Sequence, residues 1–338
     1  MAARGSVAHP QAGAVSVRLL SLANPEEWAA TISRMPHGPA HTHWYNAALS
    51  ASTDDQIVLF DYGDGENRAA CPLLLRRYGD SVDIATPYGF GGFTTRGRCD
   101  GLPDAFRRFA SAQGWICGYL ALNPLLPHPF AAADGLERGS TIYALDLSLD
   151  EDLLLASMHP THRREVRKSL VLLESVVTDG DSLRRALPSL YVDTLARVGA
   201  SETYRFSRTT LNAWLSSPGS LLLGVGEPPQ AVVLCLYTSE IADFFISAGT
   251  TQGRSHTRTL LWAALRELKR RGVRFFNLGG GARSGDDLDA FKRRFGGRSV
   301  GVPVLKQVYM HERFAALCRE ARAEDRSSGY FPPYRDSR

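Results

Sequence analysis

The segment from Asn277 to Gly297 holds the residues with the clearest potential for chemistry. A short apolar run at residues 273–278 predicts a buried strand, and three glycines follow it directly. Glycine lets the backbone approach a ligand closely, so the loop is a candidate substrate-binding element. Its glycines are Gly279, Gly280 and Gly281.

A helix is predicted after this loop. Its cap can come from Ser284, Asp286 or Asp287, and it stops at the glycine pair 296–297. Its apolar face is formed by Leu288, Phe291 and Phe295, at spacings of three and four. Lys292 lies beside that face, close to the mouth of the glycine loop. Spacing alone also allows a solvated lysine.

Composition indicates an ordinary globular protein. The chain has 338 residues, of which 44% are hydrophobic, enough for two domains with a core each. No apolar stretch reaches the length of a membrane span, and the first residues show no hydrophobic run typical of a secretion signal. We therefore expect a cytoplasmic protein.

Cysteines and histidines give no metal-binding pattern. The five cysteines are far apart in sequence, which predicts reduced thiols. His37, His41 and His43 are close together but have no acidic or cysteine partner nearby, so a polar loop leading into a helix is favoured over a metal site. We expect no metal.

Positive charge concentrates in two segments. Residues 263–300 contain ten basic and four acidic side chains, although the net charge of the chain is only +4. A second cluster occupies residues 163–168. Solvated helix faces explain either cluster alone, whereas two clusters in one chain favour a polyanionic partner. The candidate phosphate-binding residues are Arg163, Arg164, Arg167, Lys168, Arg270, Arg271, Arg293 and Arg294.

The predicted elements repeat one order. Strand, helices, several strands, helix and strand occur before the proline-rich segment 123–129 and again after it. We predict an α/β (α+β) fold with domains at residues 1–135 and 136–325 and a polar tail at 326–338; the second domain carries the active site. Within it we expect a strand at 171–177 and a helix at 182–197 that Pro188 bends or splits.

These features together resemble the Fem-like peptidyltransferases, which have two tandem acetyltransferase-like (GNAT) domains and use aminoacyl-tRNA to add an amino acid to an amine. The resemblance covers nearly the whole chain. Its weaker parts are Thr86 to Gly92, Arg163 to Lys168, and Arg197 followed by Tyr204. Its most specific part is Asn277-Leu-Gly-Gly-Gly281 with Asp287-Leu-Asp-Ala-Phe-Lys292.

The resemblance implies roles for individual residues. Phe291 and Lys292 are expected at the reacting centre, and Arg197 and Tyr204 nearer the acceptor. Tyr88 belongs to a glycine-rich loop that can close over a substrate. The donor would be aminoacyl-tRNA acting as co-substrate, with no other cofactor, and the two basic clusters would bind the tRNA.

Two departures refine the resemblance. Ordinary GNAT enzymes bind the coenzyme A pyrophosphate on a glycine-containing turn at a helix start, but here that place reads Gln252 to Arg258 without the required glycines. This disfavours acetyl-CoA. The second departure concerns the helical arm of some family members: between Tyr204 and Ser220 there is room for one short helix, so the chain is of the armless type.

The leading hypothesis is therefore an aminoacyl-tRNA-dependent aminoacyltransferase that forms an amide with a cell-wall precursor or a small peptide-like metabolite. An activated ester needs oriented substrates, charge stabilisation from Lys292 and a proton acceptor, for which Asp287 is one candidate. Asp287 is equally compatible with helix capping. An acyl-CoA-dependent N-acyltransferase and a non-catalytic nucleic-acid-binding protein on the same fold are the alternatives.

Overall fold

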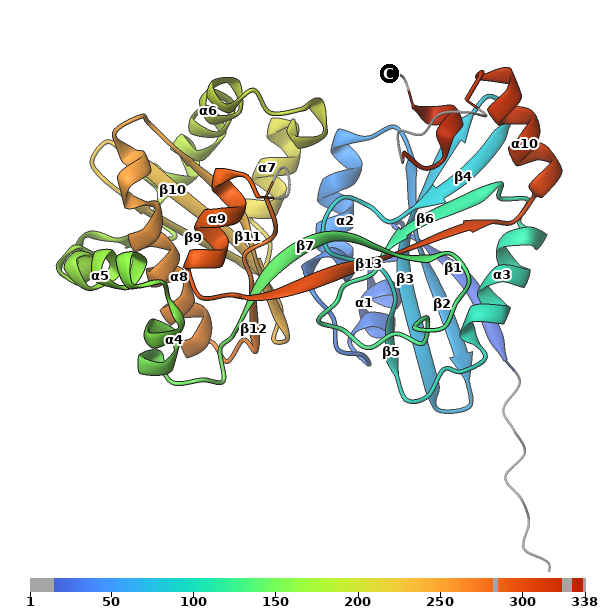
Figure 1. Cartoon of the computed structure of the whole chain (residues 1–338), viewed down its shortest axis with the longest axis horizontal. Coiled ribbons are helices and arrows are strands. Elements are labelled where there is room, and N and C mark those ends of the chain that lie inside the picture. The colour runs from blue at the N-terminus through green and yellow to red at the C-terminus, as the bar shows by residue number, and fades with distance from the viewer. Residues whose placement is uncertain (1–14, 282–284, 324–329, 337–338) are drawn as a thin grey trace, which may run out of the picture.

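A computed structural model describes residues 15–281, 285–323 and 330–336 of the protein (Figure 1). The first half of the chain forms β1 (Ser16–Ser21), α1 (Pro25–Ile32), η1 (Pro39–His41), α2 (His43–Leu49), η2 (Ser50–Ser52), β2 (Gln56–Asp64), β3 (Asn67–Tyr78), β4 (Ser81–Ala85), β5 (Thr94–Arg96), α3 (Leu102–Ala112) and β6 (Cys117–Ala121), where η denotes a 3-10 helix.

The second half begins with β7 (Leu136–Asp146), α4 (Glu151–Ser157), α5 (Pro160–Ser169), η3 (Leu170–Ser175), β8 (Val177–Thr178), α6 (Asp181–Val198), η4 (Glu202–Tyr204), α7 (Arg208–Leu215), β9 (Ser220–Val225), β10 (Ala231–Tyr237) and β11 (Ile241–Gly249). It ends with η5 (Gly253–His256), α8 (Thr257–Arg270), β12 (Phe275–Asn277), α9 (Asp287–Arg294), β13 (Arg298–Val308), α10 (His311–Glu320) and η6 (Pro333–Arg335).

One mixed sheet runs through both halves. Its order is β1-β2-β3-β4-β6-β13-β7-β12-β11-β10-β9-β8, and β5 pairs with β3. The long strand β13 pairs with β6 on one side and with β7 on the other, so β7 and β13 cross the middle of the molecule between the two lobes (Figure 1). The expected α/β fold is confirmed, and the two halves share their hydrogen-bonded sheet.

The end of the chain returns to the first half. α10 and η6 pack against β6 through a cluster that includes Ile116, Leu317 and Tyr334, and the Tyr334 hydroxyl donates a hydrogen bond to Asp83 (2.9 Å). The sequence prediction put α10 in the second domain and Tyr334 in a polar tail. In the structure Tyr334 is buried, and it packs together with α10 on the first half beside β6. The domain boundary near residue 135 stays a prediction.

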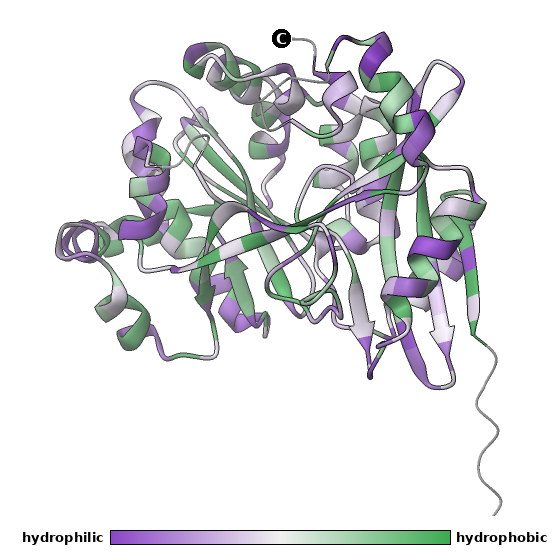
Figure 2. Cartoon of the chain, turned by 45° about the vertical axis from the view of Figure 1, so that its right-hand side comes forward, coloured by the Kyte–Doolittle hydropathy of each residue, from purple (hydrophilic) through white to green (hydrophobic). Residues whose placement is uncertain are grey.

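Three apolar clusters account for most of the core. One lies in each half, and a third joins them, with members such as Trp28 and Tyr45 from the first half and Trp214 and Leu234 from the second. The strands are largely green in Figure 2, whereas purple gathers on the outward turns of the helices. We call the contact region between the halves the seam; burial of large aromatic side chains there holds the lobes together.

One predicted strand differs from the structure, and of the two effects predicted for Pro188 the split does not occur. Residues 170–175 form the 3-10 helix η3 and only Val177 and Thr178 pair as a strand, because the side chains of Leu170, Val171 and Leu172 face solvent instead of a sheet neighbour. Pro188 does not split α6, which continues from Asp181 to Val198. None of the described helices is long and apolar enough to cross a bilayer.

Candidate active site

The glycine loop leaves the sheet at Asn277, the last residue of β12. The Asn277 side chain accepts a hydrogen bond from the Gly279 amide (2.8 Å), and Gly279 has a φ of +70°, a conformation that favours glycine. Tyr143 on β7 donates its backbone N–H to the Gly279 carbonyl (3.1 Å). The loop therefore has a fixed shape set by β7 and β12.

Gly280 approaches β7 too closely for any side chain. A Cβ atom at this position would lie 2.2 Å from the carbonyl oxygen of Thr141, which is backbone and cannot rotate away. Gly281 follows, half-buried. The backbone geometry therefore requires glycine at positions 279 and 280, two of the three glycines in the predicted loop.

Helix α9 buries part of the predicted apolar face together with two polar side chains, since Phe295 is buried and Phe291 packs against the core as predicted. Asp286 caps it by accepting a hydrogen bond from the Asp289 amide (2.7 Å), while Ser284 lies outside the described residues. Leu288 is exposed, contrary to the predicted apolar face, and the buried positions are Asp289, Lys292 and Phe295. The reason is polar pairing: the Tyr143 hydroxyl donates to Asp289 (3.1 Å) and draws this face of α9 onto β7.

Lys292 is buried at the glycine loop. Its side chain is 8% exposed, and its Nζ donates a hydrogen bond to the carbonyl of Gly280 (2.7 Å). Burial lowers the pKa of Lys292 to about 8, and the nearby carboxylates of Asp286 and Asp289 oppose this shift. The solvated alternative therefore does not apply to this lysine, and at neutral pH the ammonium form still predominates.

Asp287 occupies the first turn of α9 with its side chain exposed. The carboxylates that act on Lys292 are its neighbours Asp286 and Asp289. The cap of the helix is also Asp286 and not Asp287. A role for Asp287 as a proton acceptor stays a prediction without a supporting contact among the described residues.

A loop of the first half meets the glycine loop across the seam. A Cβ atom on Gly279 would lie 3.1 Å from Lys292 Nζ and 3.8 Å from the ring of Phe90, so these three residues converge. The Phe90 carbonyl accepts a hydrogen bond from the buried Asn123 side chain (2.8 Å). The sequence prediction named Tyr88 in this loop but not Phe90.

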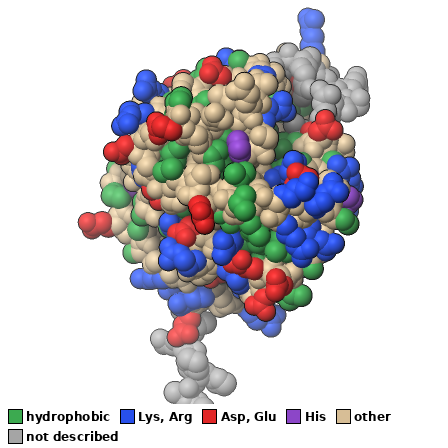
Figure 3. All heavy atoms as spheres, turned by 90° about the vertical axis from the view of Figure 1, so that its left-hand side faces the viewer, with side chains coloured by type: hydrophobic (Ala, Val, Ile, Leu, Met, Phe, Trp, Pro, Cys, Tyr) green, Lys and Arg blue, Asp and Glu red, His purple; other side chains and the backbone are tan. Residues whose placement is uncertain are grey.

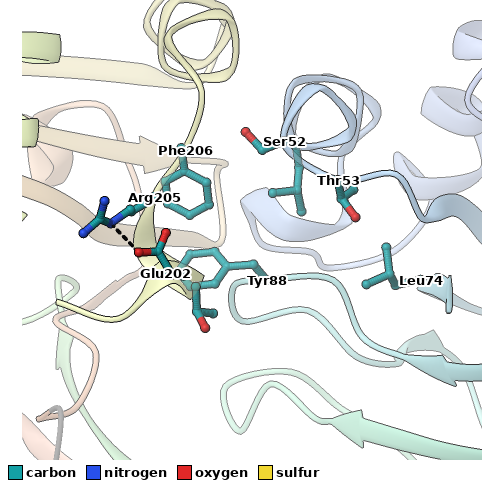
Figure 4. Close-up of a pocket in the computed structure, with 9 residues that line it drawn as sticks. Ser52, Thr53, Leu74, Tyr88, Glu202, Arg205 and Phe206 are labelled. Carbon is teal, nitrogen blue, oxygen red and sulfur yellow. Dashed lines mark ion pairs between the residues drawn. The ribbon is translucent and has the colours of Figure 1, made fainter. Parts of the chain in front are cut away.

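Tyr88 lines a pocket at the seam (Figure 4). The pocket measures about 180 Å³ and has an apolar interior that includes Leu74 and Phe206. The ion pair between Glu202 and Arg205 lies beside it (Figure 4). The pocket is thus bounded by both halves of the chain and suits a small, partly apolar group.

Tyr204 and Arg197, the two residues expected near the acceptor, lie in different parts of the structure. Tyr204 packs edge-to-face on Tyr88, with ring centroids 6.0 Å apart. Arg197 lies exposed in the last turn of α6, where its guanidinium donates to the carbonyl of Gly249 (2.9 Å). The structure brings Tyr88 and Tyr204 together, and Arg197 contacts the end of β11 instead.

A carboxylate that the sequence prediction missed lies beside the glycine loop. Asp243 on β11 is 4% exposed and accepts a hydrogen bond from the Asn277 side chain (2.8 Å). Burial raises its pKa to about 7, and the hydrogen bond from Asn277 opposes part of that shift. Its signal in the sequence is a single charged residue within the apolar strand Ile241–Gly249.

The predicted phosphate-binding residues fall into two groups. The ring of His162 on α5 lies 5.3 Å from that of Phe291, and the His159 amide donates to the Arg294 carbonyl (2.9 Å), so the α5 cluster and α9 are neighbours. Arg270 and Arg271, at the end of α8, both pair with Glu267 (2.7 and 2.8 Å). The α5 cluster thus lies beside the helix that carries Lys292, whereas the α8 pair is partly neutralised.

Cysteines and possible metal ligands form no cluster in the part of the chain that the structure describes. The five cysteines are buried, and no group of three metal-ligating side chains occurs among those residues. His41 contacts the Gly92 carbonyl through Nε2 (3.1 Å), and burial lowers its pKa to about 4, so it is a neutral core residue.

Comparison with known proteins gives structural matches alone: no protein-family model and no curated protein matches the chain. The crystal structure of FemX superposes with a TM-score of 0.65 at 12% identity, over 86% of this chain and 98% of FemX. The C-terminal domain of a putative lysylphosphatidylglycerol synthetase from Agrobacterium fabrum gives 0.56 at 17% identity, over 88% and 98%. L-PGS from Bacillus licheniformis gives 0.57 at 13% identity, over 84% and 92%.

The chain has the Fem-like fold. This confirms the fold predicted from the glycine loop and the Asp287 to Lys292 segment. Between Tyr204 and β9 the structure has the single helix α7, in agreement with the armless type. At these identities the Fem-like likeness concerns the fold, and the activity has to be argued from the site.

Proposed function

We propose that this protein is an aminoacyltransferase that moves the aminoacyl group of an aminoacyl-tRNA to an amine. The observation that carries the proposal is the buried ammonium of Lys292, held on the Gly280 carbonyl where the two halves meet. A buried lysine whose ammonium group is hydrogen-bonded to a backbone carbonyl is costly to fold, which favours a functional role over a structural one.

The reaction needs charge stabilisation and positioning. The acceptor amine attacks the carbonyl carbon of the aminoacyl ester, the carbonyl oxygen gains negative charge, and the ribose oxygen then leaves with a proton. Lys292 suits the negative oxygen or the departing ribose oxygen, because it is a preorganised cation in a site of low exposure. Asp287, exposed in the first turn of α9, is the proposed proton acceptor.

The turn before α8 supports a donor other than coenzyme A. Gly253 donates its N–H to Thr250 (3.0 Å), and a Cβ atom on Gly253 would lie 2.0 Å from the Gln230 carbonyl, so this backbone packs against its own sheet. The following residues Ser255 and His256 carry side chains where a pyrophosphate needs bare amides.

The pocket beside Tyr88 is the proposed place of the acceptor. Its apolar lining with a few polar groups fits the side chain of a peptide-like molecule, either a cell-wall precursor or a small metabolite. Tyr88, Tyr204 and the glycine loop would hold the acceptor, and Arg197 would act from the edge of this region.

The proposed function is tested by identifying the donor of the transferred group. We expect purified protein, given a charged tRNA pool with labelled amino acids and a panel of amines, to form an amide product that disappears when ribonuclease is added first. Acetyl-CoA and other acyl-CoA donors should give no product with the same amines. The measurement is product formation by mass spectrometry.

Two outcomes would contradict this expectation. A reaction that runs on acyl-CoA and ignores ribonuclease would identify an N-acyltransferase. Binding of tRNA without transfer to any amine would identify a nucleic-acid-binding protein on the same fold.

Binding of tRNA should depend on the α5 cluster more than on the end of α8. Side chains of Lys and Arg gather in separate patches on the face in Figure 3, which is the α5 side of the molecule. Arg164 is 68% exposed, and its glutamate neighbour lies at 3.9 Å, whereas Arg271 is 23% exposed and pairs with Glu267. We expect the double variant Arg164→Gln, Arg167→Gln to lower the slope of log affinity against log salt by roughly 1.4–1.8.

The double variant Arg270→Gln, Arg271→Gln is the matched comparison and should change that slope less. Filter binding over a range of salt concentrations measures both. Equal slopes for wild type and the α5 variant would remove α5 from the tRNA interface.

A further inference from the structure

Asp243 faces the seam between the two halves. Phe245 lies two residues further along β11, and its ring contacts those of Tyr45 (5.8 Å) and Tyr88 (6.2 Å) from the first half. Asp243 pairs in register with Leu236 on β10, whose side chain belongs to the cluster that joins the halves, and paired residues on neighbouring strands point to the same face, so Asp243 faces the seam as well. It lies where the Tyr88 loop and the glycine loop meet.

Two buried carboxylates of the first half, Asp61 and Asp83, have cationic partners. Asp61 accepts a hydrogen bond from Arg18 (2.8 Å), and Asp83 accepts from Arg76 (2.7 Å) and Arg335 (2.6 Å). Asp243 differs: within residues 15–281, 285–323 and 330–336, its hydrogen-bond donor is the Asn277 amide and it has no ion pair. A carboxylate can accept about four hydrogen bonds, so most of its capacity is unused.

No neighbouring group of the described chain supplies the missing positive charge. The titratable side chains that interact electrostatically with Asp243 are Tyr45 on α2, Tyr88 in the loop and Cys235 on β10. Burial raises the pKa of each, so all three are neutral at physiological pH. A buried carboxylate in such surroundings is unfavourable unless a cation joins it.

We propose that Asp243 is the binding site for the primary ammonium group of a substrate, either the α-ammonium of an aminoacyl donor or the ammonium form of the acceptor amine. This inference rests on the proposed function, because it needs a substrate that carries an ammonium group. It adds a recognition element that Lys292 cannot supply, because Lys292 is itself a cation.

The hydrogen-bond chain connects this site to the reacting centre. Asp243 accepts from Asn277, Asn277 accepts from the Gly279 amide, and the neighbouring Gly280 carbonyl accepts from Lys292 (2.8, 2.8 and 2.7 Å). An ammonium group on Asp243 would therefore sit at one end of the glycine loop, with the Lys292 cation at the other. Such an arrangement selects an aminoacyl group over a plain acyl group, because the acyl group brings no cation to pair with the carboxylate.

The experiment measures binding without turnover. The donor probe is a 3′-aminoacylamino-3′-deoxyadenosine, a stable amide version of the charged end of tRNA, compared with its N-acetylated form. The acceptor probe is glycinamide, compared with N-acetylglycinamide. At about pH 7.5, where most of the carboxylate is ionised, wild type should bind the ammonium form of one probe at least about tenfold more tightly than the acetylated form. The probe that shows this preference identifies which substrate Asp243 holds.

Asp243→Asn should abolish the preference, since it keeps the shape and the hydrogen bond from Asn277 but removes the charge. Asp61→Asn in the first half is the matched control and should keep it. A second readout uses wild type alone: the preference should vanish when the pH is lowered to about 5.5, because Asp243 becomes protonated. A preference that survives in Asp243→Asn or at low pH, or its absence in wild type, would overturn the inference. Ribonuclease sensitivity tests the donor separately, so the two failures are distinguishable.

Discussion

Replacing Lys292 with methionine is expected to lower kcat/KM for transfer by about 10²–10³-fold, because one preorganised charge donor typically contributes 2.7–4 kcal/mol to transition-state stabilisation. Methionine fills the buried space and removes a charge from it, so the fold should persist. The variant lacks the ammonium group that the Gly280 carbonyl holds at the seam, and the loss of activity follows from that. The measurements are kcat/KM and a circular-dichroism melting curve.

Lys306→Met is the matched control for this variant. Lys306 is a lysine on β13 that pairs with Glu137 away from the glycine loop, and its replacement should leave kcat/KM unchanged. If Lys292→Met reduces turnover by less than about tenfold, roughly 1.4 kcal/mol, Lys292 does not act in the reaction.

The charge of Lys292 also predicts a pH dependence. Its pKa is lowered to about 8, so the ammonium is present below that pH and is lost as pH rises above it. Transfer should therefore fall on the alkaline side of about pH 8, and Lys292→Arg should move this limb upward, because a guanidinium stays charged. The unfolded chain binds this proton up to the ordinary value of 10.5, so the free energy of unfolding should rise between about pH 8 and 10.5.

Gly280→Ala should have the second largest effect, a loss of about 10²-fold in kcat/KM, since small displacements of a catalytic group carry costs of this size. The added methyl group would lie 2.2 Å from the Thr141 carbonyl, so the loop must move away from β7 and carry the Lys292 acceptor with it. Kinetics on the purified variant and its melting temperature separate a displaced loop from a general loss of stability.

Gly101→Ala provides the control for the added methyl group. Gly101 precedes α3 with a φ of −80°, and a Cβ atom there would have the Tyr62 hydroxyl as its nearest neighbour at 3.4 Å, an ordinary contact distance. This control should keep full activity. Wild-type kinetics in Gly280→Ala would show that the loop position does not govern the reaction.

Part of the site follows from short-range sequence features. A buried apolar run, three glycines and a cappable helix with Phe291 and Lys292 are local patterns, and they led to the Fem-like fold that the structural comparisons confirm. Propensity and periodicity act over a few residues, which is why these elements could be placed without tertiary information.

Only the tertiary structure decided which face of α9 is buried. The apolar residues predicted Leu288 inward, but Tyr143, 146 residues earlier in the chain, donates to Asp289 and turns Lys292 into the interior. Asp243 could be proposed as an ammonium-binding residue only from the structure, for the same reason. That no described cation pairs with its carboxylate is visible only when both halves are packed around it. Charge, burial and pairing between distant residues are properties of the assembled seam, and no local pattern encodes them.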